Sequence, residues 1–223
     1  MGQALGAGGL DVSASDAYFS RLFDGQVVMA ILRGWDLADT VTLCERVWEG
    51  GIEVAEVAIE TAAAERSLRA AVECGRRHGR TVGAGTVTTR ERVRAAVSAG
   101  AGFTVAPGLD EQVARASLEA GLPHLPGVAT PTEIQRAVAL GFGWLKLFPA
   151  GELGSGWVRA ILGPFPEVRL VATGGVSALN AAEFLAAGAR VVAVAGALKE
   201  PTEVEALGRV QAVAVATAKT GWS

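Results

Sequence analysis

Short apolar segments alternate with longer amphipathic segments along most of the chain. The apolar segments have the length and composition of buried strands, and they predict strands at 27–32, 53–59, 81–85, 102–106, 124–127, 144–148, 168–173 and 191–195. Between them, apolar residues at helical spacing predict helices over 36–49, 62–77, 89–98, 110–120, 132–139 and 178–187. This alternation is typical of a parallel sheet covered by helices.

The number of strand–helix units predicts whether the sheet is open or closed. Eight such units favour closure into a barrel, because an open doubly wound sheet usually stops at about five or six strands. A further helix is predicted over 13–23, and a terminal helix over 202–219. We find no linker or second domain in the sequence. The pattern therefore predicts an α/β fold, a single (β/α)8 TIM barrel spanning residues 1–223, with an additional N-terminal helix and a flexible segment at 1–12.

Composition and charge indicate which kinds of partner to expect. Half of the residues are apolar, and 20 basic against 23 acidic side chains give a net charge of −3. The sequence has no basic stripe, and no apolar run reaches the roughly 18 residues of a membrane span, so we expect neither nucleic acid nor a membrane as a partner. Met1–Leu10 also lacks the basic region and apolar run of a secretory signal.

The cysteines and histidines give no sign of a metal site in the sequence. Cys44 and Cys74 lie in different predicted helices without metal-ligand spacing, which favours free thiols in a reducing compartment. The only histidines are His78, predicted at a solvated helix end, and His124, predicted to be structural. We therefore predict a cytoplasmic protein with no metal ligands and no cofactor.

One lysine stands inside an otherwise apolar predicted strand. By alternation, Trp144, Lys146 and Phe148 share one face of that strand. Glu56 is likewise a charged residue inside a strand, and two buried opposite charges offset each other's desolvation cost. Such a pair can simply fix the fold. We favour a catalytic role, because burial disfavours the charged form of an amine and so frees it to attack a carbonyl, while a nearby carboxylate can move protons.

The remaining candidate residues lie where barrel enzymes place their chemistry, at the carboxyl ends of strands and in the loops that follow. Arg33 is placed to hold a carboxylate, although a surface arginine at the barrel rim would occupy the same position. Gly174–Gly175 permits close approach of backbone N–H groups to an oxyanion, although a plain tight turn also uses two glycines. The full set, besides Lys146 and Glu56, is Arg33, Thr86, Pro107, Phe148, Thr173, Gly174, Gly175 and Gly196.

Seven short motifs follow one another in order between about residues 27 and 201, namely 55–57 (AEV), 83–87 (GAGTV), 105–109 (VAPGL), 125–130 (LPGVAT), 145–150 (LKLFPA), 163–165 (GPF) and 173–177 (TGGVS). Each motif alone is weak evidence. The ordered set resembles the 2-keto-3-deoxy-6-phosphogluconate (KDPG) aldolase family, which includes galactonate-type and 4-hydroxy-2-oxoglutarate aldolases.

The resemblance implies a metal-free class I aldolase on a homotrimeric (β/α)8 barrel. Its substrate would be a 2-keto-3-deoxy or 4-hydroxy-2-keto acid, and its products pyruvate and an aldehyde. Lys146 matches the Schiff-base lysine and Glu56 the general acid/base. Thr86 matches a threonine that binds the pyruvate carboxylate, and Gly174–Gly175 the loop that receives a distal phosphate. Two further matches, to pocket-lining residues, are Pro107 and Phe148.

Two positions depart from the family pattern. Glu60 stands where phosphogluconate-type members have arginine and galactonate-type members asparagine, and an anion there repels a carboxylate or phosphate unless Arg33 pairs with it. Ala197 follows Gly196 where the family usually has a serine that donates to phosphate. These departures make a smaller or unphosphorylated keto acid a contender. They also leave open another phosphate-binding barrel enzyme (an isomerase or synthase) and a keto-acid-binding barrel without turnover.

Overall fold

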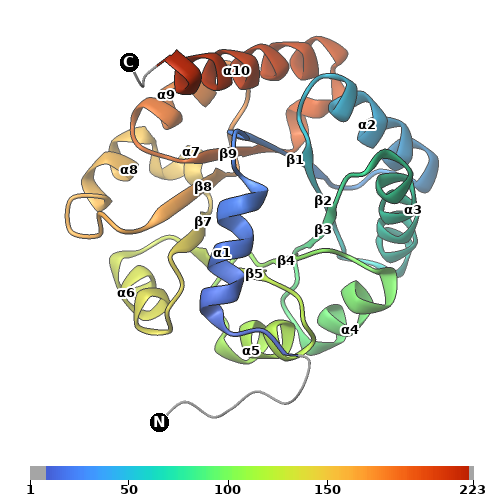
Figure 1. Cartoon of the computed structure of the whole chain (residues 1–223), viewed down its shortest axis with the longest axis horizontal. Helices are drawn as coiled ribbons and strands as arrows, with labels where there is room; N and C mark the ends of the chain where they lie inside the picture. The colour runs from blue at the N-terminus through green and yellow to red at the C-terminus, as the bar shows by residue number, and fades with distance from the viewer. Residues whose placement is uncertain (1–8, 221–223) are drawn as a thin grey trace.

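Parallel strands form one continuous sheet, which closes into a barrel with helices around it (Figure 1). The computed structural model describes residues 9–220, with side chains through 216. The predicted TIM-barrel class is confirmed. The strands are β1 (Val28–Leu32), β2 (Val54–Ala58), β3 (Val82–Gly85), β4 (Thr104–Val105), β5 (His124–Leu125), β6 (Gly127–Val128), β7 (Trp144–Leu147), β8 (Arg169–Thr173) and β9 (Val191–Val194).

The barrel closes through a strand that the sequence predicts as one piece at 124–127. The sheet order is β5-β4-β3-β2-β1-β9-β8-β7-β6, so its two ends, β5 and β6, are neighbours in the chain. β5 pairs with β4 and β6 pairs with β7. Pro126 separates them because it has no N–H to donate. Its carbonyl still accepts from the Lys146 backbone N–H at 2.9 Å. Two short strands thus replace one, and the eight predicted units remain.

Most helices begin where a side chain caps them. Thr61, Thr89 and Asp110 each accept a backbone N–H of the first turn. Thr130 and Glu133 form a capping box ahead of Pro131. The helices are α1 (Val12–Leu22), α2 (Leu37–Glu49), α3 (Ala62–His78), α4 (Arg90–Ala99), α5 (Glu111–Glu119), α6 (Pro131–Ala139), α7 (Ala150–Leu153), α8 (Ser155–Ile161), α9 (Ala181–Ala186) and α10 (Pro201–Thr220), with a 3₁₀ turn at Gly196–Lys199.

Two helical regions differ from the prediction. The sequence pattern predicts no helix between the sixth and seventh predicted strands, yet α7 and α8 lie there, separated by Gly154 at φ 78°. The helix predicted over 178–187 is shortened to α9. Its expected first turn is instead a loop, in which the Ser177 backbone N–H donates to Asn180 Oδ1 at 2.9 Å.

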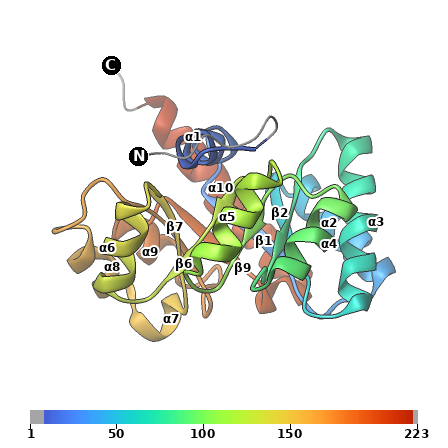
Figure 2. The same cartoon turned by 90° about the horizontal axis from the view of Figure 1, so that it is seen from below.

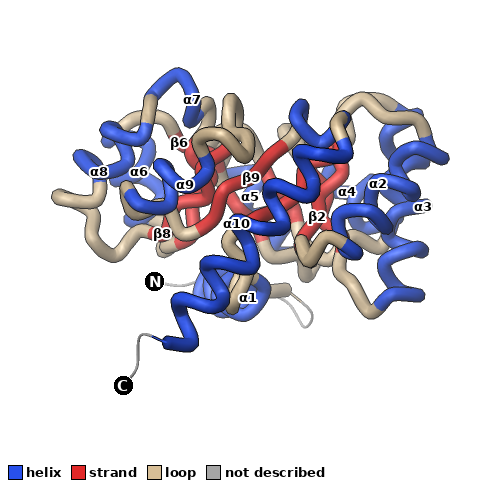
Figure 3. The backbone as a smooth tube through the Cα atoms, turned by 90° about the horizontal axis from the view of Figure 1, so that it is seen from above, coloured by secondary structure: helices blue, strands red, loops and turns tan. Residues whose placement is uncertain are grey.

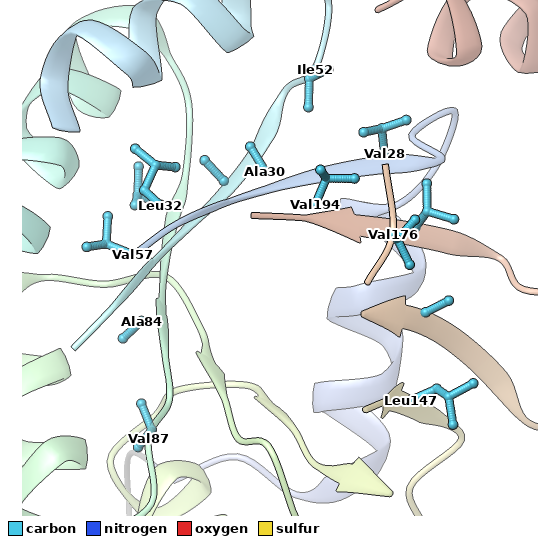
Figure 4. Packing of buried hydrophobic residues seen from close by; sticks show 14 of the residues in the cluster. Val28, Ala30, Leu32, Ile52, Val57, Ala84, Val87, Leu147, Val176 and Val194 are labelled. Carbon is cyan, nitrogen blue, oxygen red and sulfur yellow. The ribbon is translucent and has the colours of Figure 1, made fainter. Parts of the chain in front are cut away.

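Alternation along the strands sorts side chains into two apolar clusters. Leu145 and Leu147 belong to the outer cluster, between the strands and the helices, part of which is drawn in Figure 4. Trp144 belongs to the inner cluster within the barrel, where its ring lies 5.0 Å from that of Phe23. The face assigned to Lys146 from the sequence is therefore the inward one.

The N-terminal helix covers one end of the barrel. α1 crosses the barrel axis in Figure 1, and in Figures 2 and 3 it lies on the side opposite α7, which follows β7. Phe19 of α1 and Phe23, just after it, fill the amino-terminal end of the interior, which leaves the carboxyl end for a site.

Residues just before α1 contact the rest of the fold. Of the segment expected to be flexible at 1–12, residues 1–8 lie outside the described residues. The Leu10 backbone N–H donates to the Leu118 carbonyl at 2.8 Å, and Asp11 caps α1. Within the described part of the chain, no helix has the length and apolar character needed to cross a membrane.

Candidate active site

A buried cation and a buried anion meet inside the barrel. Lys146 comes from β7 and Glu56 from β2, and the strands β1, β9 and β8 lie between them in the sheet. The Lys146 Nζ to Glu56 Oε1 distance is 3.7 Å, and the two residues are 2% and 0% exposed. Both therefore project into the interior from opposite walls, as the alternation predicted.

Glu56 is held in surroundings that favour its protonated form. Neither carboxylate oxygen has a hydrogen-bond partner among the described residues. Burial raises the pKa of Glu56 above its ordinary 4.5, against the opposing charges of Lys146 and Arg33. Gly85 on the neighbouring strand makes room for the carboxylate, since a Cβ there would lie 2.7 Å from Glu56 Oε1. A raised pKa brings a carboxyl group towards the range in which it can both take and return a proton.

Lys146 shares its side of the interior with an aromatic ring. The Lys146 Nζ lies 5.7 Å from the centroid of Phe148, within the range of a cation–π contact. The same ring packs against Gly174, where a Cβ would lie 2.9 Å from it. Phe148 thus connects the lysine with the loop after β8.

Arg33 contacts two other side chains at the carboxyl end of β1. Its Nη1 lies 3.0 Å from Glu60 Oε1, and its Nη2 donates to Thr86 Oγ1 at 3.1 Å. Both charged side chains are about two-fifths exposed, at 43% and 39%. The pairing of Glu60 with Arg33 partly cancels the positive charge that the sequence analysis expected Arg33 to offer.

Thr86 has an unusual backbone conformation. At φ 58° it is the one non-glycine residue with positive φ in the described chain, and a β-branched side chain disfavours that conformation. Arg92 of α4 stabilises this backbone, because it donates to the Thr86 carbonyl at 3.1 Å and to the Glu60 carbonyl at 3.3 Å. Strain of this kind persists where surrounding contacts impose it, and it is concentrated at functional sites.

The loop after β8 packs closely on the start of α7, the helix that follows β7. Gly174 and Gly175 have φ of 86° and 73°, and the Gly151 backbone N–H donates to the Gly174 carbonyl at 2.7 Å. A Cβ on Gly151 would lie 2.9 Å from the Gly175 Cα, so three glycines permit this contact. Thr173, just before it, is 4% exposed and donates to the Val171 carbonyl at 3.3 Å.

The other predicted residues lie at the same end of the barrel. Pro107 follows β4, and its backbone packs so closely on Gly127 that a Cβ there would overlap the Pro107 carbonyl carbon. Gly196 follows β9 and begins the 3₁₀ turn. Sequence analysis missed Gly85, Gly151 and Arg92. Their contacts reach beyond the local pattern, because Gly85 and Gly151 each pack on a residue of another strand–helix unit and Arg92 donates to the carbonyl of Glu60 as well as to that of Thr86.

Other hollows lie away from this pair. A groove of about 570 Å³ opens between the start of α1, α5 and the end of α6, lined partly by Leu10, Leu118, Leu140 and Phe142. It contains none of the predicted site residues. His124 is buried, with its ring centroid 6.3 Å from that of Phe142 and its Nδ1 2.9 Å from Thr104 Oγ1.

A closed parallel barrel with a buried amine and a buried carboxylate near the carboxyl ends of its strands is the arrangement of a class I aldolase. Comparisons with known proteins agree. The model of the KDPG and KHG aldolase family matches residues 20–214, and the chain belongs to that family. It is accordingly a carbon–carbon lyase of the metal-independent, Schiff-base type.

Individual relatives give the degree of similarity. A 2-dehydro-3-deoxy-phosphogluconate aldolase of Treponema pallidum is 38% identical over 172 residues, 76% of this chain and 80% of the relative. A solved 4-hydroxy-2-oxoglutarate/2-dehydro-3-deoxyphosphogluconate aldolase is 33% identical with a TM-score of 0.76, over 93% of this chain and all of that one. A Legionella pneumophila KDPG aldolase, solved with pyruvate as a covalent carbinolamine, is 27% identical with a TM-score of 0.74, over 86% and 96%. This family membership excludes the isomerase and synthase alternatives.

Proposed function

We propose that Lys146 is the Schiff-base residue and Glu56 its proton carrier in the cleavage of a 4-hydroxy-2-keto acid. The observation that carries this proposal is the 3.7 Å approach of the two buried charged groups. The raised pKa of Glu56 suits it to accept a proton from the lysine ammonium, which leaves a neutral amine. That amine adds to the C2 carbonyl of the substrate to give a carbinolamine. Protonated Glu56 then gives its proton to the departing hydroxyl, so water leaves, an iminium forms and Glu56 becomes a carboxylate again.

Cleavage then needs one group to move protons. The Glu56 carboxylate takes the proton of the C4 hydroxyl, the C3–C4 bond breaks, and its electron pair flows into the iminium to give an enamine and a free aldehyde. Protonated Glu56 returns the proton to C3 of the enamine. Water hydrolyses the resulting iminium, which releases pyruvate and regenerates the Lys146 amine. Each step leaves Glu56 in the form that the next one requires.

The pyruvyl carboxylate is proposed to bind at Arg33 and Thr86. Arg33 donates to Thr86 Oγ1, so the two residues present a joined set of donors at the end of β1 and β3. Phe148 and Pro107 are proposed to line the substrate, and Thr173, Gly174, Gly175 and Gly196 to surround its distal end. Support for this assignment is their common position at the carboxyl end of the barrel.

We further propose that a substrate without a distal phosphate is preferred, with 4-hydroxy-2-oxoglutarate as an example. Glu60 lies 3.0 Å from Arg33 and partly neutralises the cation at the site mouth. Ala197 offers no hydroxyl to a phosphate beside Gly196. Fewer charge-assisted hydrogen bonds remain to distinguish a phosphorylated from an unphosphorylated substrate. The phosphorylated gluconate and galactonate acids would then be weaker substrates.

Oligomeric state and compartment are part of the same proposal. A homotrimer is supported by the family resemblance and by exposed apolar side chains at the carboxyl end, Leu179 at 96% and Leu37 at 48%. Light scattering would report its mass. A cytoplasmic location is supported by the free state of both cysteines.

Trapping with borohydride tests the chemistry directly. The folded protein is incubated with pyruvate and borohydride, and its intact mass and peptide map are measured. We expect one reduced pyruvyl adduct on Lys146 in the wild type and none in the Lys146→Met variant. A folded wild type without an adduct would contradict the Schiff-base proposal. Adduct formation without turnover of any 4-hydroxy-2-keto acid would instead favour a keto-acid-binding barrel.

Turnover tests the substrate preference. The kcat/KM is measured for 2-keto-3-deoxygluconate and for its 6-phosphate, which differ only in the distal group. We expect the unphosphorylated acid to be cleaved at least as efficiently. A large preference for the phosphate would overturn this part of the proposal and leave the Schiff-base chemistry intact.

A further inference from the structure

Three side chains on the outer helices bring together a thiol, an imidazole and a carboxylate. Cys74 and His78 are four residues apart on α3 and so lie on one face of it, and Glu45 reaches them from α2. Figure 1 shows α2 and α3 side by side on the outside of the barrel. No metal ligands were predicted from the sequence, because Glu45 joins Cys74 and His78 only through the packing of α2 on α3.

The distances among the three groups are those of metal ligands. Cys74 Sγ lies 3.5 Å from Glu45 Oε1 and 3.7 Å from His78 Nδ1, and all three ligand atoms lie within 4.8 Å of one another. Zinc bound tetrahedrally has metal–sulfur bonds of about 2.3 Å and metal–nitrogen or metal–oxygen bonds of about 2.1 Å, so its ligand atoms stand about 3.5 Å apart. Two of the three edges therefore already have the required length.

The electrostatic surroundings suit a dication. Cys74 is buried, Glu45 is half-buried and His78 is exposed, so the cluster has one side open to solvent. A divalent cation would compensate the charges of a thiolate and a carboxylate together, whereas the thiol proton compensates only one.

We propose that Glu45, Cys74 and His78 bind a divalent cation of the zinc class, with water in the fourth position. Mixed sulfur, nitrogen and oxygen ligands favour zinc over magnesium or calcium, which prefer oxygen alone. Binding displaces the Cys74 thiol proton to solvent, and no electron transfer is involved. The site lies outside the barrel, and Lys146 and Glu56 lie inside it. The cation would therefore join α2 to α3 and leave the Schiff-base chemistry metal-free.

Metal binding must replace a contact that His78 already makes. His78 Nδ1 lies 3.0 Å from the Cys74 carbonyl, a contact that a protonated Nδ1 would make as a donor. Binding requires the other tautomer, with the proton on Nε2 facing solvent. The centroid of the Trp48 ring lies 5.5 Å from that of the imidazole, so the two rings pack together, and His78 Nδ1 lies 3.7 Å from the sulfur.

Cobalt titration of the untagged protein tests the proposal. We expect one equivalent of Co²⁺ to produce a thiolate-to-cobalt charge-transfer band and intense visible bands of tetrahedral cobalt, both removed by Zn²⁺. Glu45→Gln, Cys74→Ala and His78→Ala are each expected to lower Zn²⁺ affinity by about 100-fold or more, since even residues behind a ligand contribute about 10–100-fold. Zn²⁺ is also expected to raise the unfolding temperature of the wild type but not of these variants.

Cys44→Ala is the matched control, because Cys44 is the only other cysteine in the sequence. It lies on α2 and, like Cys74 on α3, it is buried. It is expected to keep the charge-transfer band, while Cys74→Ala loses it. Because His78 is exposed, the His78→Ala variant is expected to fold even if Cys74→Ala, which truncates a buried side chain, does not. The proposal is overturned if the wild type shows no such band, or if the band survives His78→Ala or disappears in Cys44→Ala. Aldol cleavage is expected to be the same with and without Zn²⁺.

Discussion

Glu56 and Lys146 approach to 3.7 Å across the barrel interior, although three strands separate β2 from β7 in the sheet. Each group alone would be a buried, uncompensated charge, and a pair of this kind is seldom the most stable filling for a core. The proposed chemistry gives a reason for this pair in an otherwise apolar interior, since it needs an amine and a proton acceptor side by side.

Replacement of the carboxylate separates imine formation from cleavage. In Glu56→Gln the Lys146 amine remains, so we expect the pyruvate adduct still to be trapped by borohydride, but more slowly than in the wild type because no carboxylate takes the ammonium proton. Cleavage is expected to fall by about 10²–10⁴-fold, the usual contribution of a general acid/base. Single-turnover kinetics with mass detection of the adduct would measure both steps. Near-normal cleavage would remove Glu56 from the mechanism.

The buried pair also predicts a stability effect with a defined pH dependence. Lys146→Met leaves the Glu56 carboxylate alone in the interior, and we expect a loss of about 3–5 kcal/mol at neutral pH. The folded pKa of Glu56 is raised above 4.5, so the folded state keeps this proton to a higher pH than the unfolded state does. The loss of unfolding free energy in Lys146→Met should therefore become smaller as the pH falls through the pKa that Glu56 has in the folded state.

Urea unfolding at several pH values would measure this loss, with the double variant Lys146→Met/Glu56→Gln as the control. That variant has no buried carboxylate to ionise, so its stability should recover in part and should lack the pH dependence. A loss in Lys146→Met that is equal at acid and neutral pH would contradict this account.

Gly85 is predicted to be essential because of the space it leaves. A Cβ there would lie 2.7 Å from Glu56 Oε1, so Gly85→Ala must displace the carboxylate from Lys146. We expect kcat to fall by about 10²-fold, as when a reacting group is misplaced by about 1 Å, with the fold retained. Gly108→Ala is the matched control, since a Cβ at Gly108 meets nothing within 4 Å. Equal activity of the two variants would refute the packing argument.

Two variants are expected to shift the substrate preference. Glu60→Gln releases Arg33 from its 3.0 Å ion pair and restores positive charge at the site mouth. Ala197→Ser returns a hydroxyl donor beside Gly196. We expect both to raise kcat/KM for a phosphorylated acid relative to its unphosphorylated counterpart, together by about 10-fold, since one hydrogen bond to a charged group contributes about 1.5–3 kcal/mol before desolvation is counted. An unchanged ratio would mean that neither position contacts the distal group.

His124 predicts a loss of stability in acid. Burial lowers its pKa from 6.5 to about 4, with Asp110 acting in the opposite direction. Between these pH values the unfolded state binds more protons than the folded state, so stability falls as pH decreases from 6.5 towards 4, by about 3 kcal/mol. His124→Asn should flatten that part of the curve of unfolding free energy against pH. Thr104→Val, which keeps the imidazole and removes its hydroxyl partner, should retain the slope.

The fold was largely predictable because its signals are local. Strand and helix periods, and start signals such as Thr130 with Glu133, depend on residues close in sequence. The errors fall where local patterns are weak. Pro126 divided a predicted strand, and the short helices α7 and α8 have too few turns to show a period.

The sequence alone determined that Lys146 and Glu56 point inward, since alternation along a strand depends only on backbone geometry. It also singled out Glu60 and Ala197 as positions to examine. Only the tertiary structure decided which groups meet: Glu56 with Lys146 inside the barrel, and Arg33 with Glu60 at its mouth. The cluster of Glu45, Cys74 and His78 was decided in the same way. These pairings follow from sheet order, barrel closure and helix packing, which sum contacts over the whole chain and leave no local pattern.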